Sequence, residues 1–318
     1  MRRLLRGTPS ARNAVAFAIL AGAFSQVVSC SDRDGPENAT AVATTAGSPM
    51  LQREGCEPRA PVMRGPVSDP HGPYYHQVAI ARTTDGLSLT GAHQVLDHAS
   101  VPDGVRRANG EVLVYYVNAQ DGGVWVAKVD GDSVTALGPV TVDGVAAPAG
   151  MVDPDATALP GGGVRLIYFA SFMAGGGSRT SVMCIADSED GRSFVVRGRA
   201  IAFDETTTDP SITRLADGTW LLAASQGQKT VLARSDDGFV FQESGSFSGG
   251  GVPEVAALPD GSVRLYVCAR GVEAYRSTNG GTDWALESRD IAPGLGHKIV
   301  CDPSYVPGAG LFIYKTGD

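Results

Sequence analysis

Carboxylic acids recur at one place in a phrase that the sequence repeats five times. Each copy opens with a proline and continues as two short alternating segments around a glycine turn, as in residues 206–225 (TTTDPSITRLADGTWLLAAS). The acids beside these prolines are Asp103, Asp153, Asp155, Asp209, Glu254 and Asp302. Crowded carboxylates can serve acid/base catalysis, because crowding raises the pKa of some and leaves others ionised. The alternative is that they accept hydrogen bonds in turns.

The spacing of the copies predicts the fold. The prolines stand at positions 102, 154, 210, 253 and 303, at intervals of about 50 residues, which is typical of a β-propeller or another repeat array. Further hairpin-like phrases alternate with them, and their Ser/Asp/Asn/Gly turns supply the positive φ angles that hairpins need. These second phrases cover residues 124–138, 181–198, 230–245 and 273–288.

The two ends of the repeat are complementary. A second-type phrase at residues 76–91 precedes the first proline phrase, and residues 301–316 form a proline phrase with no partner after it. We therefore expect the N-terminal strands to complete the C-terminal blade and leave no open edge at the seam. The prediction is an all-β, five-bladed propeller of four-stranded antiparallel blades; a β-sandwich is the alternative.

The first strand of each propeller blade lines the central axis, so the acids should meet at one mouth of the channel. We expect catalytic roles for Asp103, Asp155, Asp209, Glu254 and Asp302. Asp153 is expected to bind substrate, as is His297 just before the last proline phrase, and Tyr75 offers a stacking platform for a sugar. A solvated loop histidine is the alternative for His297.

Three copies, DPSITRLADGTWLLAAS, VPDGVRRANGEVLVYYV and CDPSYVPGAGLFIYKT, resemble the blades of family 43 glycoside hydrolases of the arabinanase/β-xylosidase type. The resemblance covers roughly residues 72–318 and implies an inverting hydrolase of oligo- or polysaccharides with an Asp base and a Glu acid, about 6.5–9.5 Å apart. Asp153, Asp209 and Asp302 match the family's Asp-Pro phrases, and Asp103 matches its Ala-Pro-Asp phrase. The family's Glu-Gly-Pro phrase has no counterpart here, so the acid role would fall to Glu254 and the base role to Asp103 or Asp209.

Two other functions remain open. The turns SEDGRSF, SDDGFVF and STNGGTDW resemble the Asp-box of sialidases, whose activity would need three arginines around a carboxylate. The candidates are Arg106, Arg107, Arg165, Arg214, Arg264 and Arg270. The missing Glu-Gly-Pro phrase instead favours a non-catalytic propeller that binds glycans or proteins.

The N-terminus predicts export. Four arginines precede an apolar run at residues 14–24, and Val-Val-Ser-Cys ends at Cys30 as in a bacterial lipobox. We expect a signal peptide at residues 1–29, lipidation of Cys30, a flexible tether at 30–70 and the propeller at 71–318. The protein would lie at the cell surface or in the periplasm, held to the membrane through the lipid anchor alone; an ordinary cleaved signal is the alternative.

The cysteines and the net charge limit which disulfides, partners and metals can be expected. Export permits disulfides, and Cys268 and Cys301 should lie at the same end of neighbouring strand pairs; two buried free thiols are the alternative. The net charge is -8 and no basic cluster is interleaved with aromatics, so we expect no nucleic-acid partner. The histidines and cysteines lack metal-ligand spacing. We expect a monomer that binds carbohydrate, with no cofactor other than a structural calcium ion that the axial acids would accommodate.

Overall fold

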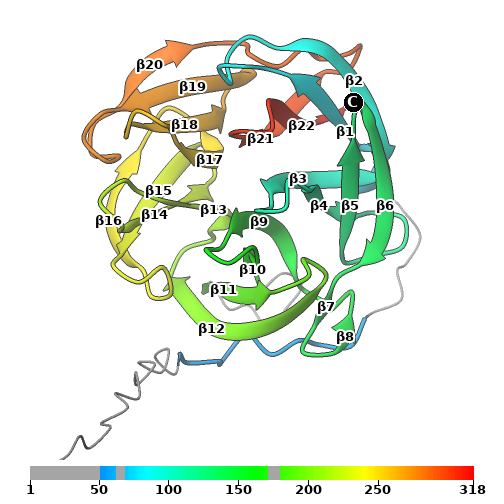
Figure 1. Cartoon of the computed structure of the whole chain (residues 1–318), viewed down its shortest axis with the longest axis vertical. Coiled ribbons are helices and arrows are strands. Elements are labelled where there is room, and N and C mark those ends of the chain that lie inside the picture. The colour runs from blue at the N-terminus through cyan, green and yellow to red at the C-terminus, as the bar shows by residue number, and fades with distance from the viewer. Residues whose placement is uncertain (1–50, 62–68, 171–179) are drawn as a thin grey trace, which may run out of the picture. The chain divides into compact units, whose positions relative to one another are not determined.

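Five antiparallel sheets surround a common axis in the computed structural model (Figure 1). The structure describes residues 51–61, 69–170 and 180–318. These residues form strands and one short 3-10 helix, η1 (Pro73–Tyr75). The all-β, five-bladed prediction is confirmed.

Three blades are simple four-stranded meanders. They comprise β3 (Ala99–Arg106), β4 (Val112–Asn118), β5 (Val124–Asp130) and β6 (Ser133–Pro139); β13 (Thr208–Arg214), β14 (Trp220–Gln226), β15 (Lys229–Ser235) and β16 (Gln242–Phe247); and β17 (Gly251–Ala257), β18 (Val263–Cys268), β19 (Val272–Ser277) and β20 (Ala285–Ser288).

A fourth blade carries two additional strands at its outer edge. Its four main strands are β9 (Val152–Ala158), β10 (Val164–Phe169), β11 (Ser181–Ser188) and β12 (Ser193–Phe203). The short hairpin of β7 (Thr141–Val142) and β8 (Val145–Ala146) extends this sheet, with β7 parallel to β12. The hairpin covers an edge that would otherwise be free to pair with another chain.

The fifth blade closes the ring. It joins β1 (Gln77–Arg82) and β2 (Thr90–Asp97) from the beginning of the domain to β21 (Ile299–Val306) and β22 (Leu311–Gly317) from its end. Six residue pairs, from Gln77↔Thr316 to Arg82↔Leu311, form the seam. The predicted closure is therefore confirmed, and it leaves β3, β9, β13, β17 and β21 around the axis.

An arginine clamp joins every blade to the next. In each clamp a guanidinium donates a hydrogen bond to a carbonyl oxygen in the turn between the two outer strands of the following blade. The five pairs are Arg107–Glu189, Arg165–Gly238, Arg234–Gly280, Arg264–Asp85 and Arg82–Gly131. Hydrogen bonds also form within these turns. The Asp190 carboxylate, for example, accepts hydrogen bonds from the amides of Arg192 and Ser193 at 2.8 and 2.7 Å.

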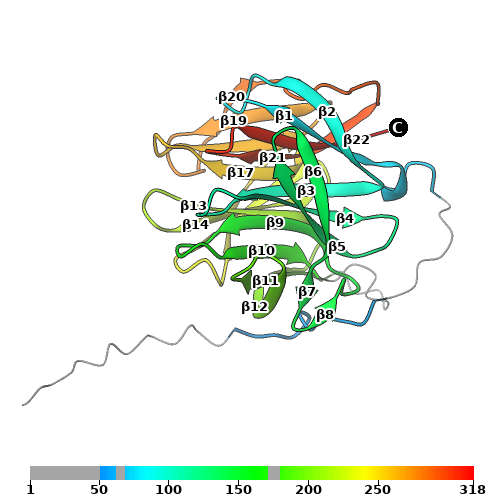
Figure 2. The ribbon, with the colours of Figure 1, turned by 45° about the vertical axis from the view of Figure 1, so that its right-hand side comes forward.

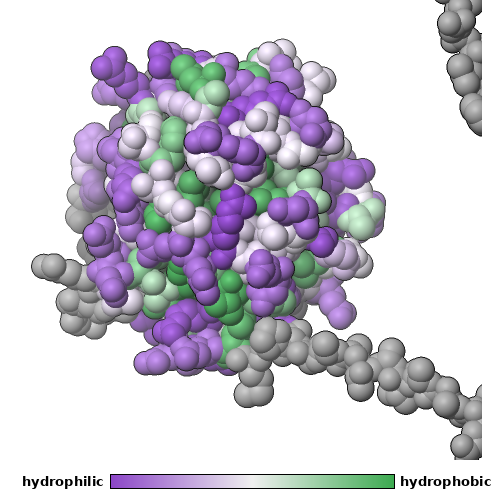
Figure 3. Space-filling view, turned by 90° about the vertical axis from the view of Figure 1, so that its left-hand side faces the viewer, coloured by the Kyte–Doolittle hydropathy of each residue, from purple (hydrophilic) through white to green (hydrophobic). Residues whose placement is uncertain are grey.

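Apolar side chains fill the space between neighbouring blades. Phe194 and Phe241, which follow two of the predicted turns, are buried there, and Tyr115 packs edge-to-face on Phe194 across one interface. The outer side of the ring in Figure 3 carries mainly hydrophilic residues with separate small apolar areas. The hydrophobic contribution to the free energy of folding therefore comes mainly from the blade interfaces.

Two disulfides tie distant parts of the chain together. One joins Cys268 to Cys301, the pair considered from the sequence; the other joins Cys56 to Cys184, which was not predicted. Residues 51–61, assigned above to the tether, lie on the side of the blade that carries β7 and β8 (Figure 2). The amide of Arg199 donates to the Gln52 carbonyl at 2.7 Å. The proposed signal peptide and Cys30 lie outside the described residues.

The clamps should contribute measurably to stability. Arg165 is buried, donates to both Asp187 oxygens and to Gly238 O, and its guanidinium lies 3.9 Å from the Phe239 ring centroid. Replacing it by Met removes the buried partner of a partly buried ion pair together with the bond to Gly238, so Arg165→Met should lower the free energy of unfolding by about 3 kcal/mol in urea titrations. The exposed Arg214→Met is the matched control and should change it by less than about 0.5 kcal/mol. Equal losses of unfolding free energy in the two variants would show that the clamps do not contribute to stability.

Candidate active site

Two rings of side chains surround the axis where the first strand of each blade begins. The mouth ring consists of the residues before the five prolines: Val101, Asp153, Asp209, Val252 and Asp302. The inner ring consists of the residues after them: Asp103, Asp155, Ser211, Glu254 and Ser304. All six predicted acids therefore lie in one of two adjacent layers at the same end of the channel.

The prolines explain why the mouth-ring side chains point toward the axis. Proline has no N–H to donate, and in every blade the pairing between the first two strands shifts register around the X-Pro step. All five mouth-ring residues have left-handed φ angles, between 47° and 51°. That conformation is uncommon for any residue with a Cβ and is a genuine outlier for Val101 and Val252. Such irregularities turn side chains toward functional sites.

The inner ring holds neighbouring blades together. Asp103 Oδ2 accepts the amide of Ala156 at 2.6 Å, and Asp155 Oδ2 accepts that of Ile212 at 3.1 Å. Two serines do the same: Ser211 Oγ accepts Val255 N and Ser304 Oγ accepts Gly104 N, each at 3.0 Å. In four of the five interfaces, the side chain after the proline therefore binds an unpaired amide of the next blade.

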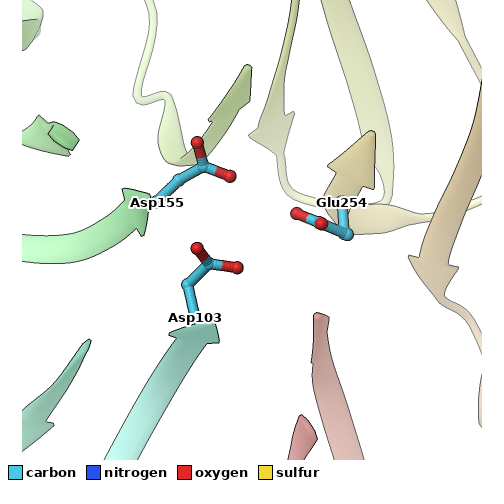
Figure 4. Close-up of side chains that lie close together, drawn as sticks. All are labelled: Asp103, Asp155 and Glu254. Atoms are coloured by element: carbon cyan, nitrogen blue, oxygen red, sulfur yellow. The ribbon is translucent and has the colours of Figure 1, made fainter. Parts of the chain in front are cut away.

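Glu254 departs from this pattern. Its Oε2 accepts a hydrogen bond from the Ser211 hydroxyl at 2.8 Å, and the structure shows no amide of β21 bound to it. The carboxyl group instead points across the axis at Asp103 and Asp155 (Figure 4). One oxygen from each of the three lies within 4.8 Å of the others. We call these three residues the inner cluster.

Burial is the main influence on the inner cluster. It raises the pKa of Asp103 to about 6, although the Ser304 hydroxyl and the Ala156 amide act in the opposite direction. Burial raises the pKa of Asp155 and of Glu254 as well, and the neighbouring Asp103 carboxylate raises both further. Three carboxylates this close cannot all stay ionised without a cation, so the cluster holds protons near neutral pH.

The mouth ring is more accessible and contains a cation that sequence reasoning missed. Asp153 and Asp209 are partly exposed, whereas Asp302 is buried and forms an ion pair with Lys315 of β22. Burial first, and then the charge of Asp302, raise the pKa of Asp209 to about 6. Burial and the Asp209 charge raise the pKa of Asp153. The ring thus combines two proton-holding carboxyls with one ion-paired carboxylate.

The acids separate two cavities along the channel. The cavity at the mouth has a volume of about 30 Å³, room for about two water molecules. A chamber of about 180 Å³ lies beyond, and Asp155 and Glu254 border both spaces. The space among the acids at the mouth therefore has room for water only.

The remaining predicted site residues lie away from these cavities. His297 contacts Gln94 and Asp318, and Tyr75 is exposed beside Tyr74 in η1; neither residue lines the mouth cavity or the chamber. The Cys268–Cys301 disulfide directly precedes Asp302, whose amide lies 3.3 Å from Cys268 Sγ. Of the arginines considered for a sialidase, Arg107, Arg165 and Arg264 belong to blade clamps and not to the channel.

Comparisons with known proteins identify structural relatives. No family model matches the sequence, and no curated protein matches it. A thermostable family-43 glycoside hydrolase matches with a TM-score of 0.50 at 13% identity, covering 68% of this chain and 83% of that chain. An α-L-arabinofuranosidase from Clostridium thermocellum also has a TM-score of 0.50, at 14% identity over 66% of this chain and 80% of that one. A family 43 enzyme from Xanthomonas citri has a TM-score of 0.49 at 13% identity, over 69% and 87% of the two chains.

The chain has the five-bladed fold of family 43 glycoside hydrolases. The sequence resemblance anticipated this architecture. At these identities the likeness concerns the fold, and any activity has to be argued from the two rings.

The raised pKa values predict how stability depends on pH. Asp103 and Asp209 titrate near 6 when folded and near 3.8 when unfolded, so the folded protein binds more protons between these values. The free energy of unfolding should therefore fall as pH rises from 4 through 6, by up to about 3 kcal/mol per carboxyl. His76, whose pKa burial lowers, opposes this trend weakly.

Urea unfolding at pH 5 and pH 8 checks this expectation. Glu254→Gln removes one carboxyl from the inner cluster and should make the difference between the two pH values smaller. The turn variant Asp217→Asn is the control and should leave the difference unchanged. A protein that is more stable at pH 8 than at pH 5 would contradict the charge states described above.

Proposed function

We propose that this protein is an exported, lipid-anchored hydrolase that cleaves glycosidic bonds at the mouth ring by carboxylate acid/base catalysis. The observation that carries the proposal is the unequal pair at the mouth, a partly exposed Asp209 with a raised pKa and an Asp302 paired to Lys315. An acid and a base held in opposite protonation states are what glycoside hydrolysis requires.

The fold itself does not require these acids. Ser211 and Ser304 accept the same interblade amide as Asp103 and Asp155, without a charge. Val101 and Val252 adopt the same backbone conformation as the three mouth aspartates. Carboxylates at the other positions make the folded state less stable through burial and repulsion, so a function is the simplest reason for their presence.

The proposed reaction uses mouth-ring residues only. Asp209, protonated, donates its proton to the glycosidic oxygen as the bond from that oxygen to the anomeric carbon breaks. The Asp302 carboxylate accepts a proton from a water molecule whose oxygen bonds to the same carbon. Burial and the Asp302 charge keep the pKa of the acid high, and Asp153 Oδ2 accepts the Asp209 amide at 3.3 Å. The products are two sugars with free hydroxyl groups, and the two carboxyls exchange a proton through solvent before the next cycle.

These assignments differ from those considered first. The family resemblance placed the acid at Glu254, but this side chain lies in the inner cluster and points at Asp103 and Asp155. The closest oxygens of the cluster lie within 4.8 Å, which leaves less room for water than the 6.5–9.5 Å of an inverting pair. We therefore assign the acid to Asp209 and the base to Asp302.

Export and anchoring rest on the N-terminal sequence. The basic and apolar residues before Cys30 support a lipoprotein signal, and two disulfides suit a protein that folds outside the cytoplasm. The described part of the chain contains no helix that is long and apolar enough to cross a membrane. Cys30 would then supply the attachment.

A non-catalytic glycan-binding or interaction propeller is the second candidate. The small volume at the mouth favours it, because only about 30 Å³ lies between the rings and a sugar would contact the mouth ring from one side. A binding protein would need no proton transfer. Activity measurements separate the two functions.

Activity on aryl arabinofuranosides, aryl xylosides, arabinan and xylan tests the proposal. Asp209→Asn and Asp302→Asn should each reduce kcat/KM about 100-fold or more, since each removes a proton-transfer group. Asp217→Asn, an exposed turn residue, should retain full activity. Full activity in both mouth variants would refute the assignment, and oligosaccharide binding without turnover would favour the second candidate.

The inner cluster also fits a structural calcium ion. Its donors are carboxylate oxygens, which calcium and other hard cations prefer, and a cation would neutralise the crowding. Asp103 and Asp155 each use Oδ2 for an amide, which leaves Oδ1 for an ion.

Calcium at about 1 mM should raise the melting temperature, and more at pH 8 than at pH 5, because protons compete for the same oxygens. Asp155→Asn should abolish the increase, and Asp217→Asn should preserve it. An equal increase in both variants would place any calcium elsewhere.

A further inference from the structure

Lys315 is unusual for its position in the repeat. In every blade one residue of the second strand pairs with the residue two before the proline. The other copies hold Val117, Phe169, Ser225 and Cys268 at this place, and the closing blade holds Lys315, opposite Cys301. A charge therefore replaces an apolar or small side chain in the one blade that the two ends of the domain build together.

The surroundings of Lys315 consist of mouth-ring acids and one histidine. Its Nζ forms an ion pair with Asp302 Oδ2, and the two side chains are only 14% and 4% exposed. Asp209 and Asp153 act on its charge from the two blades that are not adjacent to the closing blade, and His76 lies close enough to be affected by it. Burial first, and the charge of Lys315 second, lower the pKa of His76, so the His76 imidazole beside Lys315 is neutral.

Burying an ammonium group is costly unless opposite charges compensate it. Burial by itself would lower the pKa of Lys315, but Asp302, then Asp209 and Asp153, raise it above its usual value. The lysine in turn lowers the pKa of both Asp153 and Asp209. Lys315 thus contacts one acid directly and tunes the other two at longer range.

We propose that Lys315 is the positioning residue of the mouth ring and that its ion pair holds the Asp302 carboxylate in place. The inference rests on the proposed hydrolase function. It explains why Asp302 serves as the base and Asp209 as the acid, because Asp302 is the mouth-ring acid that forms an ion pair with a cation. Lys315 itself transfers no proton.

The test compares Lys315→Met with Lys315→Arg, and uses the exposed Lys229→Met as the control. Without the ammonium group, Asp209 should hold its proton to higher pH, because Lys315 lowers the pKa of this carboxyl. The loss of stability between pH 5 and pH 8 should therefore be larger in Lys315→Met, with its midpoint shifted upward by about one pH unit. Lys315→Arg should restore the wild-type profile.

On a substrate of the wild-type protein, Lys315→Met should lower kcat/KM at least about tenfold and move the alkaline limb of the pH profile upward by a similar amount. Lys315→Arg should again restore the profile. An unchanged pH profile of both unfolding and activity in Lys315→Met, or failure of Lys315→Arg to restore it, would overturn the inference.

Two further comparisons keep the outcomes distinct. If the wild-type protein hydrolyses no glycan, the proposed function fails and the unfolding profiles alone decide the role of Lys315. If Lys315→Met does not fold, Asp302→Asn is compared with Asp302→Asn/Lys315→Met, which buries neither charge of the pair. The double variant must then lose more stability between pH 5 and pH 8 than the single one, and equal losses would reject the proposal.

Discussion

The inner edge of each first strand has no neighbouring strand, and the structure depends on how that edge is satisfied. The first strands belong to separate sheets and do not pair with one another, so side chains have to link neighbouring blades beside the axis. Here the residue after each proline provides the link, binding an amide of the next blade in four of the five interfaces. The same prolines interrupt pairing and turn the preceding residue toward the axis. One short phrase therefore joins the blades and equips the channel.

The phrase also explains why stability and function are in tension at the axis. A serine meets the structural need, as Ser211 and Ser304 show, whereas a carboxylate adds desolvation and repulsion. Acids occupy six of the ten positions in the mouth ring and the inner ring, and a lysine lies beside one of these acids. The arginine clamps at the rim act independently of this arrangement, so they can stabilise the blades while the axis remains strained and charged.

The sequence was sufficient for the repeat, the number of blades, the closure through β1 and β22, and the gathering of the acids at one end of the channel. All of these follow from spacing and from the proline. It was insufficient where side-chain reach decides the outcome: Glu254, one carbon longer than Asp, crosses the axis instead of binding the next blade. Lys315 lies on a second strand, away from the prolines, and it stands out only when the five second strands are aligned, as the one charged residue at its position. The Cys56–Cys184 bridge lies outside any repeat, so no pattern indicated it.

The central claim is that the mouth ring, and not the inner cluster, is where a sugar meets the acids. A crystal structure of Asp209→Asn with a bound oligosaccharide tests it most directly. The account predicts a glycosidic oxygen within hydrogen-bonding distance of residue 209, with Asp302 on the other side of the anomeric carbon. A sugar bound in the chamber beyond the inner cluster, or on the outer surface of the blades, would contradict it.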